Sequence, residues 1–93
     1  MISVMASLSV TQYPPGIIDQ GNFVQLECVT TGYDTKKVQW MFNSQVITTN
    51  NLYRIAAVDE HSAGNYMCTG FFQSDEKHEK NLTLNVRCKL MVV

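Results

Sequence analysis

Apolar and polar side chains alternate over several short stretches of the chain, which is the period-2 pattern of half-buried β-strands. The clearest stretch is residues 23–30, where Val24, Leu26 and Cys28 share one face. Residues typical of turns separate the stretches, as in Tyr13-Pro14-Pro15-Gly16. The pattern predicts strands at residues 7–12 with a continuation at 17–18, and at 23–30, 37–42, 45–48, 53–55, 64–71 and 82–86.

The same alternation predicts which side chains point outward from the third and sixth strands. Val38 and Trp40 would face inward in the third strand, so that Gln39 and Met41 face outward. The sixth strand then has its own outward set, which is Met67 and Thr69, with Phe71 and Phe72 at the strand end.

Four residues carry a resemblance to a known family. Trp40 follows Cys28, and Tyr66 stands two residues before Cys68. This spacing resembles an immunoglobulin superfamily domain over roughly residues 7–86. The resemblance implies an all-β, Greek-key sandwich of about seven strands, with a Cys28–Cys68 disulfide between the sheets. It also implies that Trp40 packs on the disulfide and that the Tyr66 hydroxyl bonds to backbone a few residues upstream.

Three further features of the sequence show which kind of immunoglobulin domain the chain resembles and where it differs from the family. The interval from Trp40 to Cys68 is too short for the extra strands of a variable-type domain, which favours a compact C2 or I type. The family usually has an aspartate where Ser62 stands, so its ion pair with Arg54 is weakened here. The prolines at 14 and 15 cannot donate to a ladder, which in this family lets the first strand change sheets.

Length and composition indicate one globular domain. The chain has 93 residues, of which 45% are apolar and 16% charged, with a formal net charge of −1. We expect a single domain over 1–93, with its core at 7–86 and a tail or stalk at 87–93. The sequence has no basic stripe of the kind that binds nucleic acid. It also has no apolar run that approaches the ~20 residues of a membrane span. A membrane segment or signal peptide would therefore lie outside this sequence.

The three cysteines bear on the compartment. A disulfide between Cys28 and Cys68 would be worth about 4 kcal/mol by loop entropy and would imply an oxidising environment. Glycosylation at the sequon Asn81-Leu82-Thr83 would agree with that setting. The alternative is a cytosolic module with reduced cysteines. If Cys28 and Cys68 pair with each other, Cys88 is left over. It is then either an adventitious thiol or a cysteine in a stalk that bridges to another chain.

The tail has its own resemblance. Residues 86–91 are similar to the stalk of the signalling chains that accompany the T-cell receptor, although Met91 replaces the second cysteine of their Cys-x-x-Cys.

Catalytic and metal-binding chemistry has little support in the sequence. His61, His78 and Cys88 are the only soft ligands besides the cysteine pair, and no ligand motif joins them. No nucleophile or phosphate-loop motif is present. The mixed charges of residues 73–80 are typical of a solvated loop. We therefore expect no enzyme, no metal and no cofactor.

The outward face of strands three, six and seven is the first candidate for a partner site, because methionine and phenylalanine are enriched at the centres of protein interfaces. Its residues are Gln39, Met41, Met67, Thr69, Phe71 and Phe72. The alternative is that one phenylalanine covers the core and neighbours cover the methionines. The loops at 31–34 and 73–80 are the second candidate.

The run Tyr53–Cys68 resembles the membrane-distal domain of Fc-receptor-like leukocyte proteins, and T-cell receptor accessory chains come next. This resemblance implies an extracellular, immune-type cell-surface receptor ectodomain, non-catalytic, that binds a protein ligand or co-receptor chain and forms homo- or heterodimers. The alternative is a structural module from a tandem array of the adhesion, matrix or muscle type.

Overall fold

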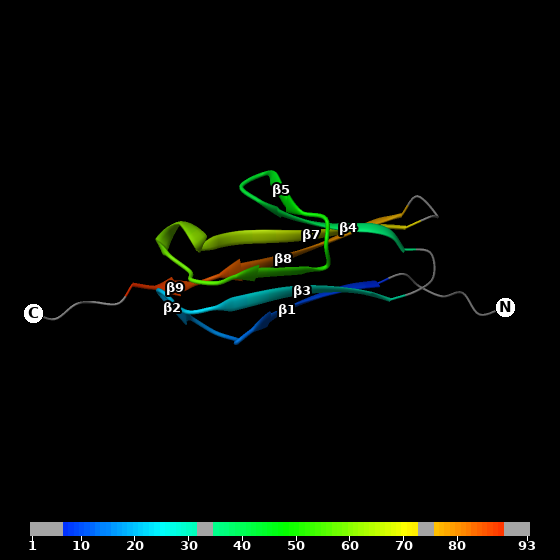
Figure 1. The fold of residues 1–93 in the computed structure, drawn as a ribbon. Helices are drawn as coiled ribbons and strands as arrows, with labels where there is room; N and C mark the ends of the chain where they lie inside the picture. The colour runs from blue at the N-terminus through cyan, green and yellow to red at the C-terminus, as the bar shows by residue number, and fades with distance from the viewer. Residues whose placement is uncertain (1–6, 32–34, 73–75, 89–93) are drawn as a thin grey trace, which may run out of the picture.

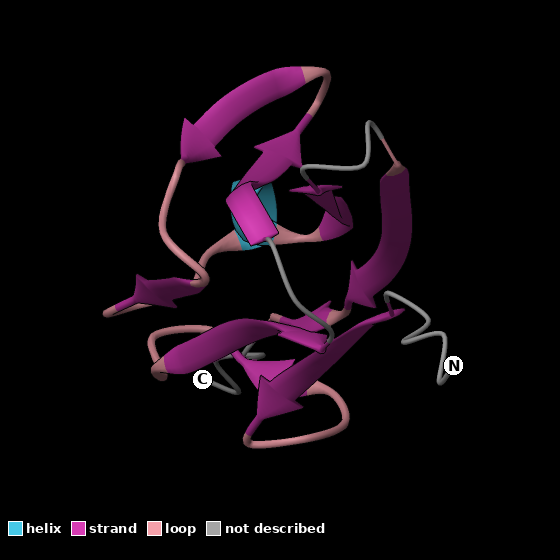
Figure 2. Ribbon diagram, turned by 90° about the vertical axis from the view of Figure 1, so that its right-hand side faces the viewer, coloured by secondary structure: helices cyan, strands magenta, loops and turns pink. Residues whose placement is uncertain are grey.

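The protein is a sandwich of two β-sheets. The computed structural model describes residues 7–31, 35–72 and 76–88, and the architecture of these residues is drawn in Figure 1. The first sheet has the order β1-β3-β6, and the second has the order β5-β4-β7-β8. Viewed along the strands in Figure 2, the sheets form two separate layers. The strands are β1 Ser7–Tyr13, β2 Ile18–Asp19, β3 Val24–Thr31, β4 Thr35–Phe42, β5 Gln45–Thr48, β6 Leu52–Ile55, β7 Gly64–Phe72, β8 Lys77–Leu84 and β9 Val86–Arg87.

The first predicted strand is divided between two partners. β1 runs antiparallel to β3, whereas β2 runs parallel to β9. The break between them is held by the Gln12 side chain, whose Nε2 donates to the carbonyls of Pro14 and Gly16, each at 2.8 Å. Gly16 has a φ of 88°, a conformation that glycine adopts without strain. The first strand therefore leaves the first sheet as predicted, but β2 forms a separate two-stranded sheet with β9 and does not join the four-stranded one.

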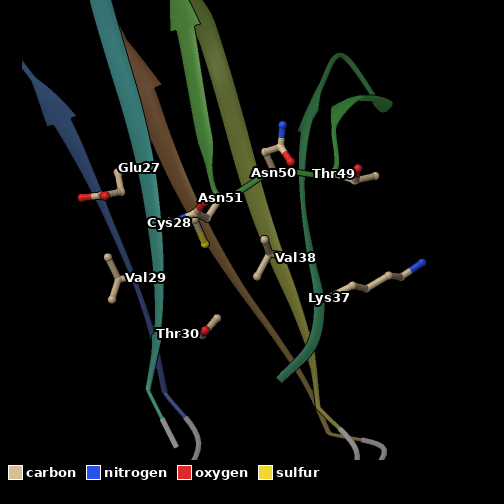
Figure 3. Close-up of a pocket in the computed structure, with 9 residues that line it drawn as sticks. All are labelled: Glu27, Cys28, Val29, Thr30, Lys37, Val38, Thr49, Asn50 and Asn51. Atoms are coloured by element: carbon tan, nitrogen blue, oxygen red, sulfur yellow. The ribbon is translucent and has the colours of Figure 1, made fainter. Parts of the chain in front are cut away.

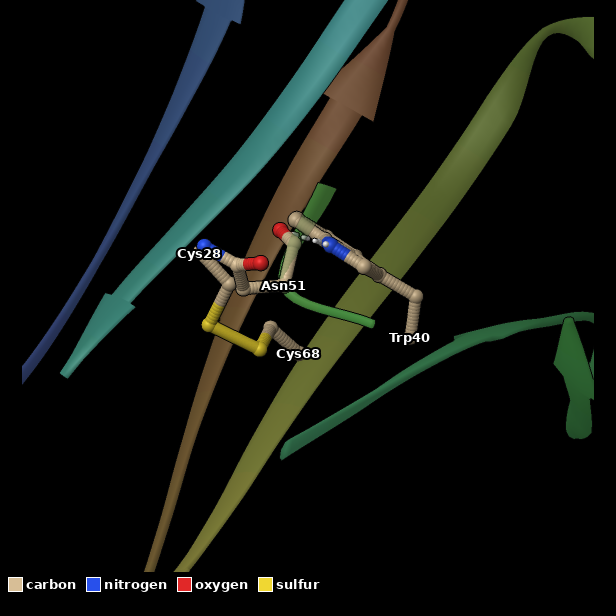
Figure 4. Close-up of a disulfide and its surroundings, with 4 residues drawn as sticks. All are labelled: Cys28, Trp40, Asn51 and Cys68. Carbon is tan, nitrogen blue, oxygen red and sulfur yellow. Dashed lines mark hydrogen bonds between the residues drawn. A yellow bond between two sulfur atoms is a disulfide. The ribbon is translucent and has the colours of Figure 1, made fainter. Parts of the chain in front are cut away.

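A disulfide between Cys28 of β3 and Cys68 of β7 joins the two sheets, as the sequence predicted. Trp40 lies beside it and is 0% exposed. Figure 4 shows the indole Nε1 donating to the carbonyl of Asn51 at 3.1 Å. The same carbonyl accepts a hydrogen bond from the backbone N–H of Cys28 at 2.8 Å. One carbonyl thus satisfies both the buried indole and the backbone where β3 extends past β6.

The remaining core is apolar and comes from both sheets. Its buried members besides the disulfide and Trp40 are Leu8, Ile18, Val24, Leu26, Val58, Tyr66 and Leu84. The alternation read from the sequence is clearest in β3, whose burial switches residue by residue from Val24 to Cys28.

A 3₁₀ helix, η1 Glu60–Ser62, precedes β7 and positions the buried tyrosine. The Asp59 carboxylate accepts hydrogen bonds from the backbone N–H groups of His61 and Ser62, and the Ser62 hydroxyl accepts one from the N–H of Asp59. The Tyr66 hydroxyl then donates to the Ser62 carbonyl at 2.6 Å. Ser62 is therefore part of the helix cap. Arg54 donates instead to the side-chain oxygen of Gln25 at 3.1 Å.

The last long strand begins earlier than the sequence predicted. β8 starts at Lys77 and pairs with β7 from Phe71↔Lys77 to Gly64↔Leu84, so the predicted loop at 73–80 is wrong for 77–80. Most of this part of β8 is exposed, so backbone pairing rather than burial holds it. A strand of that kind leaves no apolar alternation in the sequence. The final strand, β9, ends at Arg87, within the residues expected to form the tail.

The two outer strands of the four-stranded sheet differ in character. β5 follows a two-residue turn in which Asn43 and Ser44 have φ values of 52° and 63°, and it contains Gln45, Val46, Ile47 and Thr48 with no charged side chain. Val46 is 50% exposed. β8, at the opposite border, begins with Lys77, His78, Glu79 and Lys80.

Candidate protein-binding face

The outer face is the side of the four-stranded sheet that points away from the disulfide. We define it by three rows of register partners that run across β4, β7 and β8. The rows are Met41–Met67–Asn81, Gln39–Thr69–Glu79 and Lys37–Phe71–Lys77. Five of the predicted partner residues therefore stand together on adjacent strands.

The methionine row lies beside a shallow hollow. Met41 and Met67 are both half-buried, and the side-chain amide of Gln39 donates to the sulfur of Met41 at 3.6 Å. Asn81 is exposed, and its Oδ1 accepts a hydrogen bond from Asn65 Nδ2 at 3.3 Å. The hollow has a volume of about 350 Å³, and its lining contains no ionisable side chain. The lining residues are Met41, Asn43, Ser44, Asn65, Met67 and Asn81.

Thr69 corrects the predicted exposure of this face, since only 2% of it is exposed. It points to the outer side, but its register partners Gln39 and Glu79 have longer side chains, so the short threonine lies below them. Its Oγ1 has no hydrogen-bond partner in the described part of the chain. Thr69 therefore cannot contribute contact area without rearrangement of its neighbours.

The two phenylalanines at the end of β7 point to opposite faces of the four-stranded sheet. Phe71 is half-buried on the outer face, where the ammonium of Lys37 lies 5.0 Å from its ring centroid. Phe72 is 2% exposed and meets the ring of His78 edge to face at 5.4 Å. The predicted exposure of Phe72 is therefore wrong, because strand alternation turns it inward when Phe71 turns outward.

A larger hollow, of about 630 Å³, lies between the sheets near the disulfide and was not foreseen from the sequence (Figure 3). Glu27, Val29 and Thr30 line it from β3, Lys37 and Val38 line it from β4, and residues 49–51 complete it. It exists because β6 pairs with β3 only up to Glu27. No local sequence motif marks it, since its lining comes from three separate segments.

The remaining predicted residues are dispersed. Cys88 is an exposed free thiol just after β9, where Arg87 donates to the Asp19 carboxylate at 2.6 Å. That hydrogen bond, and then the negative charge of Asp19, raises the pKa of Arg87. His61 lies 3.6 Å from Glu60, and His78 lies 3.1 Å from Glu76. Of the second candidate surface, the loops at 31–34 and 73–80, residues 32–34 and 73–75 lie outside the described residues.

Two negative findings apply to the ranges 7–31, 35–72 and 76–88. Three or more histidine, cysteine, aspartate or glutamate side chains do not gather there in a group that could hold a metal ion. The same ranges contain no helix with the length and apolar character needed to cross a membrane.

Comparison with known proteins assigns the family. A family model described as an immunoglobulin domain matches residues 9–70, and the chain belongs to this family. The two sheets, the disulfide joining them and the buried Trp40 are the structural counterpart of that match. A search of curated proteins gives no match.

The chain is similar to particular immunoglobulin domains of known structure. It is 28% identical to the N-terminal four Ig domains of Dscam1 isoform 6.9, with a TM-score of 0.72, covering 86% of this chain and 21% of that one. It is also 28% identical to the N-terminal eight Ig domains of Down Syndrome Cell Adhesion Molecule isoform 1.30.30, with a TM-score of 0.74. That match covers 90% of this chain and 13% of the other. The chain therefore spans about a fifth or less of these similar proteins.

Proposed function

We propose that the chain is a non-catalytic ectodomain module of a cell-surface receptor, and that it binds a protein partner through the outer face. The domain covers residues 1–93, with its core at 7–86 and a tail at 87–93. Similarity to domains of a protein named as a cell adhesion molecule supports a surface location, as does a disulfide that needs an oxidising compartment.

The sequence predicted an immune-type receptor ectodomain, with a structural module of a tandem array as the alternative, and one observation adds support to the alternative. The immune-type receptor rests on the resemblance to Fc-receptor-like and T-cell receptor accessory chains. The adhesion-type module of a tandem array has the additional support of the similarity to Dscam1, whose structures contain consecutive Ig domains. We favour the adhesion type, with a ligand or a second receptor chain as the partner in a homo- or heterodimer.

The row of Met41 and Met67 is the observation that carries the choice of face. Two thioether side chains stand side by side on adjacent strands, partly open to solvent, on a rigid sheet that the disulfide fixes from behind. Methionine is adaptable and polarisable, and it is enriched in the buried centre of protein interfaces. Phe71 adds a further apolar side chain at one end of the face, separated from the methionines by the Gln39–Thr69–Glu79 row.

The experiment uses beads coated with the disulfide-bonded chain refolded without glycans, mixed with one another and with cells that display the receptor after enzymatic removal of its N-linked glycans. Met41→Arg and Met67→Arg each place a charge in the methionine pair, where burial on binding costs several kcal/mol. We expect at least about a tenfold loss of bead clustering or cell binding, which corresponds to about 1.4 kcal/mol.

Ile17→Arg is the matched control, because Ile17 is an exposed apolar residue outside the outer face, between β1 and β2. It should bind as the wild type does. Near-ultraviolet circular dichroism establishes that all three variants are folded. Unchanged binding by both methionine variants would show that the partner uses another surface.

A further inference from the structure

The sequon Asn81-Leu82-Thr83 lies on the outer face and not in a loop. Asn81 and Thr83 are both exposed on β8, and Leu82 between them is half-buried. Successive residues of a strand point to opposite faces, so the asparagine and threonine of the sequon share the outer side. Asn81 is the direct register partner of Met67, which is in turn the partner of Met41.

The hydrogen bond of Asn81 suits modification of its amide nitrogen. Asn65 Nδ2 donates to Asn81 Oδ1 at 3.3 Å. An N-linked glycan is attached through Nδ2 of asparagine, and that atom is not used in this bond. The attachment therefore keeps the Asn65–Asn81 hydrogen bond, and the bond orients the first sugar relative to the sheet.

The hollow beside Asn81 has the chemistry of a sugar-binding surface. Its lining combines two thioethers with the amides of Asn43, Asn65 and Asn81 and the hydroxyl of Ser44, and none of these groups ionises. N-acetylglucosamine is neutral, with C–H groups on the ring faces and hydroxyl and acetamido groups at the edges. The volume of about 350 Å³ lies at the small end of ligand sites.

We propose that Asn81 carries an N-linked glycan whose first sugars lie over Met67 and Met41, and that this glycan closes the outer face to the protein partner. The regulatory half of this inference rests on the proposed function, whereas the modification and its position do not. The donor is a lipid-linked diphosphate oligosaccharide. Asn81 Nδ2 forms a bond to its anomeric carbon, the bond from that carbon to the diphosphate breaks, and the proton lost from the amide goes to the lipid diphosphate.

The first test is occupancy. The full chain is secreted from mammalian cells behind a signal peptide, and its intact mass is measured before and after treatment with endoglycosidase. We expect a glycan on the wild type that is absent from Asn81→Gln and from Thr83→Ala. Secreted, disulfide-bonded wild type without sugar on Asn81 would overturn the proposal.

The second test is the position of the glycan, read as the rate at which peroxide oxidises Met41 and Met67. Peptide mass analysis should show severalfold slower oxidation of both in the glycosylated wild type than in either variant. Thr83→Ala is the decisive comparison, because it removes the glycan while Asn81 and its bond to Asn65 stay. Trimming to a single N-acetylglucosamine should keep the protection. Equal rates in all forms would overturn the placement over the methionines.

The third test is closure of the face in the bead experiment. Thr83→Ala should bind more strongly than the glycosylated wild type, and Met67→Arg in the Thr83→Ala background should lose that binding. Thr83→Ala that binds no better than the glycosylated wild type would overturn the closure. If binding without glycan is insensitive to Met67→Arg, the partner site is wrong, while the mass and oxidation results still decide the glycan and its position.

Discussion

The hydroxyl of Tyr66 gives the sharpest test of how the corner before β7 is held. Tyr66→Phe deletes one oxygen and keeps the ring, so the stack on Phe42, with centroids 4.4 Å apart, is retained. What is lost is the 2.6 Å hydrogen bond to the Ser62 carbonyl. A net hydrogen bond is worth about 1 kcal/mol, and water can reach half-buried Ser62 after the change, which limits the loss to that size.

The measurement is urea unfolding with the disulfide intact. For a domain of this size, about 1 kcal/mol lowers the melting temperature by about 4–8 °C, and moves the urea midpoint by up to about 1 M. Tyr53→Phe is the control, because Tyr53 is half-buried and its hydroxyl makes no hydrogen bond among the described residues. We expect that control to stay within about 0.5 kcal/mol of the wild type.

The Tyr66 hydroxyl also predicts how the free energy of unfolding depends on pH. Burial, followed by the negative charges of Tyr53 and Asp59, raises the pKa of Tyr66 from 10.0 to about 12. Below pH 10 the hydroxyl is protonated in both the folded and the unfolded chain, and wild type exceeds Tyr66→Phe by the full hydrogen bond. Between pH 10 and 12 only the unfolded chain releases the proton, so the stability of the wild type falls.

The difference in unfolding free energy between wild type and Tyr66→Phe should therefore shrink as pH rises through that range. A Tyr66→Phe variant as stable as Tyr53→Phe at neutral pH, or a difference that stays constant up to pH 12, would refute the reasoning.

Two further substitutions test packing on the two sides of β7. Thr69→Val replaces a buried hydroxyl that has no hydrogen-bond partner in the described chain with a methyl group. Urea unfolding should therefore show a free energy of unfolding higher by about 1 kcal/mol. A destabilised variant would reveal a hydrogen bond to Oγ1. Gly70→Ala places a Cβ 2.9 Å from the Cδ1 of buried Leu8, so it should lower the melting temperature through a loss of about 1–3 kcal/mol; an unchanged melting temperature would show that β1 yields without cost.

The sequence could predict the strands because their alternation is a local signal, and the resemblance to immunoglobulin domains implied the disulfide between the two sheets. In β3, one buried face and one exposed face leave alternation at Val24, Leu26 and Cys28. The cysteine, tryptophan and tyrosine spacing adds the disulfide and the Tyr66 corner. Each of these positions is nearly closed to solvent, so apolar or disulfide-bonded residues are favoured there, and the pattern remains visible in one sequence.

The misses occur where neighbours on other strands decide the outcome. Lys77–Lys80 belong to β8 through backbone pairing with β7, which leaves no apolar signal. The burial of Thr69 depends on the lengths of Gln39 and Glu79, which stand on two other strands. The larger hollow depends on where β6 stops pairing with β3, which no short motif encodes.

The unlike borders of the four-stranded sheet bear on how copies of the molecule could join. β5 offers an uncharged edge of main-chain groups, whereas β8 presents lysine and glutamate side chains that discourage a further strand from adding. A strand of another molecule can therefore add to this sheet at β5 but is discouraged from adding at β8. A contact in which the β5 edges of two molecules pair uses both of these edges, so this contact by itself joins two molecules only.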